Sequence, residues 1–162
     1  MLAQTPVQIA WVTTDLDATE KTLTLLLGAR KWVRMPGVHF EPDTCTYRGR
    51  PADIVANISM SYAGDTQLEL IEPVSGESAY TEFLDRAGPG LHHICIEVDD
   101  VDGAIDAAAT GYEVVQRGLA PGGMEFAYVT AEAAGVPYIE IARPSRDTRA
   151  FFNYVKQKQE QQ

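Results

Sequence analysis

The sequence contains two copies of one pattern, and this internal repeat restricts the possible folds more than any other feature. Residues 7–17 read VQIAWVTTDLD and residues 92–102 read HHICIEVDDVD, so that a shift of 85 places Gln8 on His93. In both copies an alternating apolar strand runs into the acidic start of a helix. A repeat of this kind predicts two related modules in tandem, each too small to bury its apolar face alone.

A second pair of stretches supports the duplication. The segments QLELIEP at 67–73 and YIEIARP at 138–144 align with a shift of 71, which places Glu69 on Glu140. This shift is smaller than the first because the first copy has a longer middle, residues 36–52. That segment has no pattern of its own and is predicted to be a loop, and loops of this size are more often functional or mobile than short connections.

Each module is predicted to have the order βαβββ, which makes the chain an α+β protein. The predicted elements are strands 6–13, 30–35, 53–62 and 66–72 with helix 15–27 in the first module, and strands 91–98, 112–117, 124–130 and 136–142 with helix 101–110 in the second. The predicted division is a first module at 1–75, a linking helix at 76–87, a second module at 88–145, and a C-terminal helix and polar tail at 146–162.

The composition limits the classes of function. The chain has 162 residues, 45% of them hydrophobic, and its 13 basic and 23 acidic residues give a net charge of −10. An acidic excess argues against nucleic acid or a membrane surface as a partner, because both require a basic patch. No apolar run is long enough to span a membrane, and the N-terminus lacks a secretory signal. With only Cys45 and Cys95 and no CxxC motif, a soluble protein of the reducing cytoplasm is expected.

Four polar residues, Gln8, Glu69, His93 and Glu140, stand in the paired apolar strands. For any one of them, a solvent-facing position on an antiparallel sheet is the ordinary interpretation. All four occupy equivalent positions of the repeat, however, and pseudo-symmetry would bring them together inside the protein. Two carboxylates would not share a buried site with His and Gln without a compensating cation. One nitrogen and three oxygens suit a divalent ion such as Zn, Ni, Co or Mn.

These modules and residues resemble the vicinal oxygen chelate superfamily, which includes glyoxalase I, methylmalonyl-CoA epimerase, extradiol dioxygenases and metal-free bleomycin-resistance proteins. The resemblance covers about residues 5–145, and FLDRAGPGLHHICIEVDDVDGAI at 83–105 looks most like the epimerase group. It implies a curved mixed sheet around a central cavity, a homodimer, and a divalent metal. The implied metal ligands are Gln8, Glu69, His93 and Glu140.

The resemblance implies a metal-dependent isomerase or lyase that abstracts a proton next to a carbonyl through a metal-stabilised enolate. The reaction would be epimerase-like or glyoxalase I-like, on a small carboxylate or thioester substrate. Glu140 is the implied catalytic base and Glu69 the second catalytic candidate. Two features depart from the epimerase pattern: Gln8 replaces the usual His, and Arg48 and Arg50 lie where an acid is expected. The alternatives are a metal-free small-molecule-binding protein and an Fe(II) extradiol-type dioxygenase. The resemblance disfavours the dioxygenase, because its iron site takes a His at the start of both modules and the first of these positions is Gln8 here.

Other residues have two open interpretations. His39, Arg48 and Arg50 could contact a substrate or lie as ordinary polar residues on the surface. Cys95 shares the face of His93 and could line the cavity, although a buried apolar role is more common for a single thiol. His92 is expected to face the packed side or a helix and to have a structural role.

Overall fold

The computed structural model describes residues 4–108 and 111–161. The last two residues of the predicted helix 101–110, the first three residues of the first module and the last residue of the tail lie outside this part. The described elements are β1 (Pro6–Val12), α1 (Leu16–Leu27), β2 (Val33–Phe40), β3 (Cys45–Tyr47), β4 (Arg50–Pro51), β5 (Ile54–Ala63), β6 (Thr66–Ser75), α2 (Ala79–Ala87), β7 (Gly90–Glu97), α3 (Val101–Ala108), β8 (Val114–Ala120), β9 (Met124–Thr130), a 3₁₀ turn (Glu132–Ala134), β10 (Tyr138–Arg143) and α4 (Arg146–Lys158).

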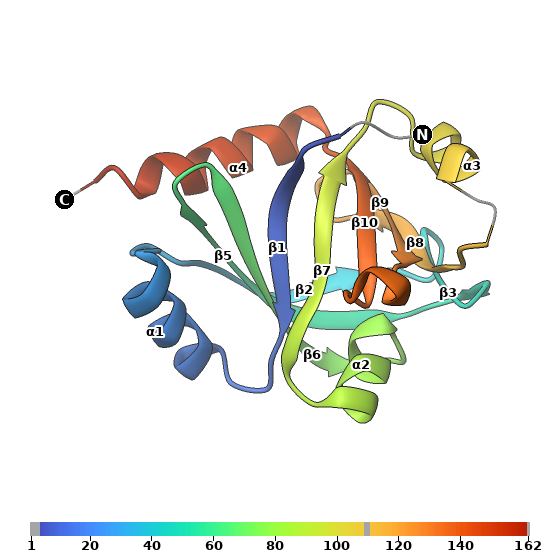
Figure 1. Ribbon diagram of the computed structural model, residues 1–162, viewed down its shortest axis with the longest axis horizontal. Helices are drawn as coiled ribbons and strands as arrows, with labels where there is room; N and C mark the ends of the chain where they lie inside the picture. Colours follow the sequence, from blue (N-terminus) through green and yellow to red (C-terminus); the bar gives the residue numbers. More distant parts are fainter. Residues whose placement is uncertain (1–3, 109–110, 162) are drawn as a thin grey trace.

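All the described strands join one sheet in the order β2-β5-β6-β1-β7-β10-β9-β8-β3-β4. The first strand of each copy, β1 and β7, pair antiparallel in the middle of the sheet. Each of them also pairs in parallel with the last strand of its own copy, β6 and β10 respectively. The sheet is therefore mixed, and it curls into a half-barrel (Figure 1). The predicted α+β fold with a curved mixed sheet is confirmed.

Helices α1 and α3 begin at acidic residues, as the sequence predicts, and α1 ends at a glycine. The Asp15 side chain accepts a hydrogen bond from the amide of Ala18 at the start of α1, and that helix ends at Gly28, which has a φ of 76°. In the second copy the Asp100 carboxylate accepts from the amide of Gly103. A carboxylate at this position satisfies a free amide of the first turn, which is why these acidic residues mark both helix starts.

The prediction of a loop at residues 36–52 is wrong. Its first part continues β2, where Pro36 and Gly37 interrupt the apolar alternation and shift the register against β5. The rest contains the short hairpin of β3 and β4, which crosses to the second copy and pairs with β8. Gly118 of β8 permits this approach, since a Cβ atom there would lie 2.2 Å from the carbonyl oxygen of Thr44.

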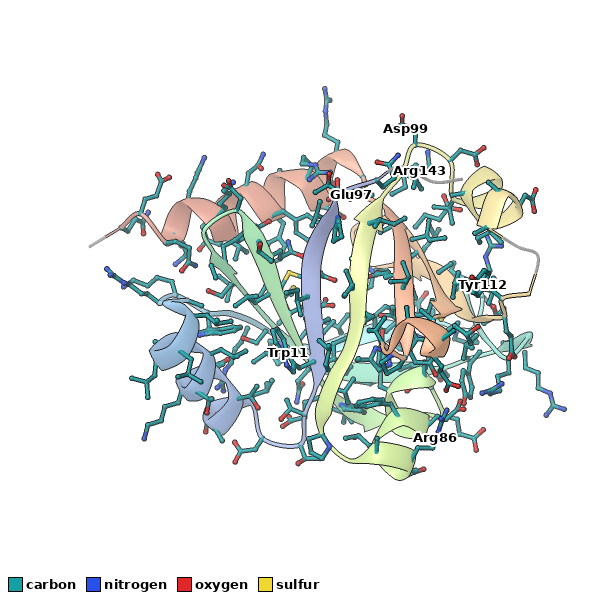
Figure 2. The ribbon with its side chains drawn as sticks, in the orientation of Figure 1. Trp11, Arg86, Glu97, Asp99, Tyr112 and Arg143 are labelled. Atoms are coloured by element: carbon teal, nitrogen blue, oxygen red, sulfur yellow. The ribbon has the colours of Figure 1, made fainter. Side chains whose placement is uncertain are left out.

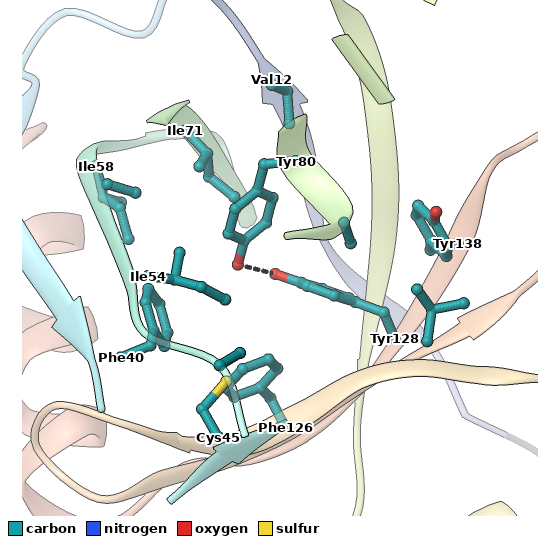
Figure 3. Packing of buried hydrophobic residues seen from close by; sticks show 14 of the residues in the cluster. Val12, Phe40, Cys45, Ile54, Ile58, Ile71, Tyr80, Phe126, Tyr128 and Tyr138 are labelled. Atoms are coloured by element: carbon teal, nitrogen blue, oxygen red, sulfur yellow. Dashed lines mark hydrogen bonds between the residues drawn. The ribbon is translucent and has the colours of Figure 1, made fainter. Parts of the chain in front are cut away.

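The main apolar core fills the concave side of the sheet. Tyr80 of α2 and Tyr128 of β9 meet in it through their hydroxyl groups, beside Phe126 (Figure 3). Helix α4 lies along one side of the sheet (Figure 1) and buries Phe152 and Val155 in the same core. None of the helices in the described ranges combines the length and apolar character of a membrane span.

Candidate functional site

Two neighbouring rows of inward side chains cross the centre of the sheet, and the four predicted site residues belong to them. In one row Gln8 of β1 is paired with Cys95 of β7, which is paired with Glu140 of β10. In the next row Glu69 of β6 reaches His93 of β7 through the small residue between them on β1. Because side chains two residues apart share a face of a strand, all four project into the interior from adjacent strands.

The structure brings these four side chains together around one nitrogen atom. Nε2 of His93 lies 3.0 Å from Oε2 of Glu140, 3.5 Å from Oε2 of Glu69 and 3.1 Å from Oε1 of Gln8. None of the four residues is more than 7% exposed. The structure therefore places together the four side chains that the internal repeat predicted to be neighbours.

The two carboxylates determine the charge on His93. Burial disfavours the imidazolium, but the adjacent Glu140 and Glu69 outweigh this effect and raise the pKa of His93 to about 9. Burial is also the largest influence on Glu69 and raises the pKa of its carboxyl group, against the opposing effect of His93. In the metal-free protein a proton on His93 thus supplies positive charge to the cluster at neutral pH.

His92 fixes the orientation of the His93 ring. The register between β1 and β7 shifts at this point, so that His92 is an extra residue on β7 and is fully buried. Its Nδ1 lies 2.8 Å from Nδ1 of His93, and its Nε2 lies 3.3 Å from the carbonyl oxygen of Ala79 in α2. These partners assign the protons: His93 donates to His92, and His92 donates to the carbonyl. This arrangement leaves Nε2 of His93 facing the carboxylates.

The donor set fits a divalent metal ion. Ligand atoms of Glu69, His93 and Glu140 lie within 4.8 Å of one another, and the amide oxygen of Gln8 adds a fourth donor. One imidazole nitrogen, two carboxylates and one amide oxygen suit Zn or a similar first-row ion. Two carboxylates buried at one point also require a cation, and a metal would take the place of the His93 proton.

Two parts of the site were missed by the sequence reasoning. Gln67 accepts a hydrogen bond from Nε2 of Gln8 at 2.5 Å and so turns the amide oxygen of Gln8 toward His93. Its spacing of two residues from Glu69 on one strand was the available signal. The ring of Tyr128 packs 4.8 Å from the ring of His93, and its hydroxyl lies 2.8 Å from that of Tyr80 (Figure 3). The linking helix that carries Tyr80 has no counterpart in the repeat, so no pattern indicated this contact.

The residues with two open interpretations lie elsewhere. His39 is exposed and its Nε2 lies 2.5 Å from Oδ1 of Asp53. Arg48 forms surface ion pairs with Glu82 and Glu113. Cys95 is buried, and burial raises the pKa of its thiol well above the ordinary value. Arg50 is exposed on β4. None of these residues is among those that line the cavity beside the cluster.

That cavity has a volume of about 240 Å³, and Glu69 and Glu140 lie in its wall. Its other walls are mainly apolar side chains of β2, β5, β9 and α4, among them Met35, Met60, Met124, Phe126, Phe151 and Phe152. The carboxylates are therefore accessible from a largely apolar space. Such a space strengthens electrostatic interactions with a bound molecule.

Comparison with known proteins gives both relatives and structural neighbours. "Uncharacterized protein YqjC" of Bacillus subtilis (strain 168) is 28% identical over 94 residues, which make up 56% of this chain and 67% of that protein. The mitochondrial methylmalonyl-CoA epimerase of Mus musculus is 46% identical over 44 residues, or 26% of this chain. The chain thus matches only 24% of the length of that epimerase.

Solved structures resemble the whole fold. The crystal structure of methylmalonyl-CoA epimerase from Mycobacterium tuberculosis has a TM-score of 0.62 at 19% identity and covers 93% of this chain and 97% of its own. Hypothetical protein BH1468 from Bacillus halodurans C-125 has a TM-score of 0.60 at 21% identity, with coverages of 90% and 97%. The sequence profile described as Glyoxalase/Bleomycin resistance protein/Dioxygenase superfamily matches residues 7–128. The chain therefore belongs to the glyoxalase/bleomycin resistance protein/dioxygenase superfamily.

Proposed function

We propose that this protein is a divalent-metal-dependent isomerase or lyase that removes a proton from a carbon next to a carbonyl group. The observation that carries the proposal is the buried Gln8, Glu69, His93 and Glu140 cluster, two of whose carboxylates line an apolar cavity. Membership of the superfamily and the epimerase-like neighbours support enzyme chemistry of this kind. The epimerase-like and glyoxalase I-like reactions are the two forms of it.

The metal would be held by Glu69, His93 and Glu140, with the amide oxygen of Gln8 as the fourth donor. A bound divalent ion would supply Lewis-acid stabilisation of negative charge that develops on substrate oxygen. The chain itself orients these donors. Gln67 holds the amide of Gln8, while His92 holds the ring of His93 through its Nδ1 atom.

The proton would move between the substrate carbon and a carboxylate. Both Glu140 and Glu69 reach the cavity, so each can meet a carbon held there. Glu140 is the proposed base: a carboxylate oxygen takes the proton and the electron pair of the carbon–hydrogen bond moves into the enolate. Return of that proton to a neighbouring carbon gives a glyoxalase-like reaction. Delivery of a proton by Glu69 to the other face of the same carbon gives epimerisation.

Burial raises the pKa of the Glu69 carboxyl group in the metal-free protein, whereas a metal ligand must be deprotonated, so the part of Glu69 in proton delivery rests on its position in the cavity wall. The walls around these carboxylates are mainly apolar. Substrates of the proposed class are small carboxylates or thioesters, as in the resembling enzymes. The solved neighbours include a methylmalonyl-CoA epimerase in complex with methylmalonyl-CoA.

A homodimer is part of the proposal. Ile9, Ile94 and Ile139 are cross-strand neighbours on the outer face of β1, β7 and β10, and all three are only partly buried. Trp11 continues this apolar row on β1 (Figure 2). A second copy would bury this surface. Analytical ultracentrifugation of wild type and Ile94→Lys tests it: a shift from dimer to monomer in the variant supports the arrangement, and a monomeric wild type contradicts it.

The test of the function begins with metal content, measured by mass spectrometry on wild type, His93→Ala, Glu140→Ala and the control Glu132→Ala, an exposed carboxylate. About one divalent ion per chain is expected in wild type and control, and none in the two site variants. Deuterium exchange from solvent into 2-methyl thioesters and 2-oxoaldehyde adducts then tests the proton transfer, with loss expected in Glu140→Gln.

If no divalent ion binds after zinc, nickel, cobalt, manganese and iron(II) are supplied, the enolate mechanism is wrong. The metal-free small-molecule-binding protein then becomes the better account of the same cavity. Iron-dependent uptake of dioxygen would instead favour the dioxygenase, which the one histidine that faces the carboxylates disfavours.

A further inference from the structure

The cavity beside the cluster differs in character from a site for a small, polar substrate. Next to Glu69 and Glu140, its wall is formed by methionine and phenylalanine side chains from four separate elements. Phe126 of β9 is 1% exposed and Phe152 of α4 is 6% exposed, so packing fixes these two walls, while Met35, Met124 and Phe151 are partly buried. A molecule bound here would have its oxygens at the carboxylate end and apolar surface over the rest of its length.

The charged residues of the cavity lining also favour a substrate that is mostly apolar. Three charged residues contribute to it, and all three are acidic: Glu69, Glu140 and Asp147. Among the described residues that line the cavity, no lysine, arginine or histidine is available to pair with a second anionic group of a substrate. Burial of an unpaired carboxylate or phosphate among methionine and phenylalanine side chains would be costly. The part of the substrate that lies away from the cluster is therefore uncharged.

The volume of the cavity limits the size of the uncharged part of the substrate. A dry cavity of about 150 Å³ lined by leucine, isoleucine and phenylalanine is enough to bind benzene. The cavity here has about 240 Å³. It therefore has room for a six-membered ring together with a short oxygen-bearing chain, whereas a methyl substituent would leave most of it empty.

We propose that the substrate is a small molecule with oxygen atoms on two neighbouring carbons and, next to them, an apolar group of about phenyl size. This inference rests on the proposed function for the position of the oxygens at Glu69, His93 and Glu140. It goes further in assigning the rest of the cavity to an uncharged aryl or branched alkyl substituent. Hydrophobic contact with the cavity walls then provides most of the binding free energy, and the cluster provides the orientation.

Helix α4 would determine this specificity together with β2. It is outside the two repeated copies, yet it contributes Thr148, Phe151 and Phe152 to the lining. Burial of Phe152 and Val155 in the core holds it in position, and Lys156 forms a surface ion pair with Asp65. The repeated strands provide the cluster, whereas α4 provides part of the wall. Substitutions in α4 can therefore alter which apolar substituent binds without altering the proton-transfer residues.

The test compares two neutral probes with the same vicinal oxygens, 2-hydroxyacetophenone and hydroxyacetone, which differ in phenyl against methyl. Binding to the zinc-loaded protein is measured by isothermal titration calorimetry. Burial of the additional apolar area predicts that the phenyl compound binds roughly 30-fold or more tightly. Equal affinities, or tighter binding of hydroxyacetone, would overturn the inference.

Substitutions that fill the cavity locate the effect. Val38→Trp on β2 places a large ring in the cavity and is expected to remove at least tenfold of the phenyl preference while hydroxyacetone still binds. Met35→Trp, from the same strand, is the second filling variant in case the first does not fold. Val74→Trp is the control, because Val74 is 58% exposed and is absent from the lining. An unchanged phenyl preference in a folded filling variant would contradict the assignment.

The outcomes separate this inference from the proposed function. Deuterium exchange and metal binding without phenyl preference would leave the function standing and refute the substrate class. Phenyl preference that Val38→Trp removes, in a protein that binds no metal and exchanges no proton, would support the cavity assignment and refute the enzyme mechanism.

Discussion

Metal binding should displace a proton from His93, and the structure sets the size of this effect. The carboxylates of Glu140 and Glu69 overcome burial and raise the pKa of His93 to about 9, so the metal-free ring is protonated at pH 7.5. A metal ion needs the Nε2 lone pair, and the proton must leave first. Below pH 9 the apparent affinity should rise about tenfold for each pH unit, and above pH 9 it should level off.

The assay is calorimetric titration with zinc in two buffers of different ionisation enthalpy, which counts the protons released. At pH 7.5 about one proton per ion is expected from His93, and any proton held by Glu69 adds to this number because burial raises its pKa. His39→Gln is the control, since His39 is exposed and pairs with Asp53 away from the cluster. Release of no proton at pH 7.5, with zinc bound, would refute the charge state derived for His93.

The raised pKa of His93 also makes the stability of the metal-free protein depend on pH. The pKa of His93 is raised on folding, so its contribution to the stability of the metal-free protein is complete below about pH 6.5, the value for an unperturbed histidine. That contribution is lost as the pH rises through about 9. Denaturant unfolding should therefore give a lower free energy of unfolding at pH 9 than at pH 7, and His93→Ala should abolish this part of the pH dependence.

Three further substitutions, one with a control variant, test the contact that orients His93, the close approach of β8 and β3, and the packing of α4. His92→Phe keeps the ring packing but removes the acceptor for Nδ1 of His93, and zinc affinity should fall about 10- to 100-fold in competition with a chelator; an unchanged affinity would show that His92 does not position the ring. Gly118→Ala should lower the free energy of unfolding by about 2 kcal/mol or more, because its Cβ would clash with β3. Gly90→Ala is its control, since the nearest atom to that Cβ lies at 3.7 Å, and equal losses in the two variants would contradict the clash. Phe152→Ala should cost about 3 kcal/mol in denaturant unfolding, and a loss near zero would show that α4 contributes little to the core.

The four clustered residues were predictable because duplication supplies information that a single strand lacks. A glutamate between two aliphatic residues, such as Glu69 between Leu68 and Leu70, is ordinary on a solvent-facing strand. Its alignment with Glu140 indicates two equivalent strands, and pairing of β1 with β7 places their inner faces together. The alternation of period two then determines the direction of each side chain without any knowledge of the rest of the fold.

The wall of the cavity was only partly predictable, because helices α2 and α4, which contribute to it, lie outside the repeat. The hairpin of β3 and β4 was not predictable either, since it has too few residues for a periodic signal and its partner β8 lies in the other copy. Non-local pairing of short strands depends on tertiary contacts such as the close approach at Gly118. A C-terminal helix was predicted within residues 146–162, but nothing in its sequence indicates that Phe151 and Phe152 face the site.

Different neighbours hold the equivalent side chains Gln8 and His93, and this difference makes the centre of a pseudo-symmetric sheet asymmetric. At one position Gln8 is held by the amide of Gln67, and at the equivalent position His93 is held by His92, the extra residue of β7. Without this bulge, His92 would alternate to the outer face and His93 would lack its acceptor. The ring of His93 would then be free to rotate its Nε2 atom away from the carboxylates. The irregularity in the second copy is therefore a condition for the cluster, and the repeat alone would not have produced it.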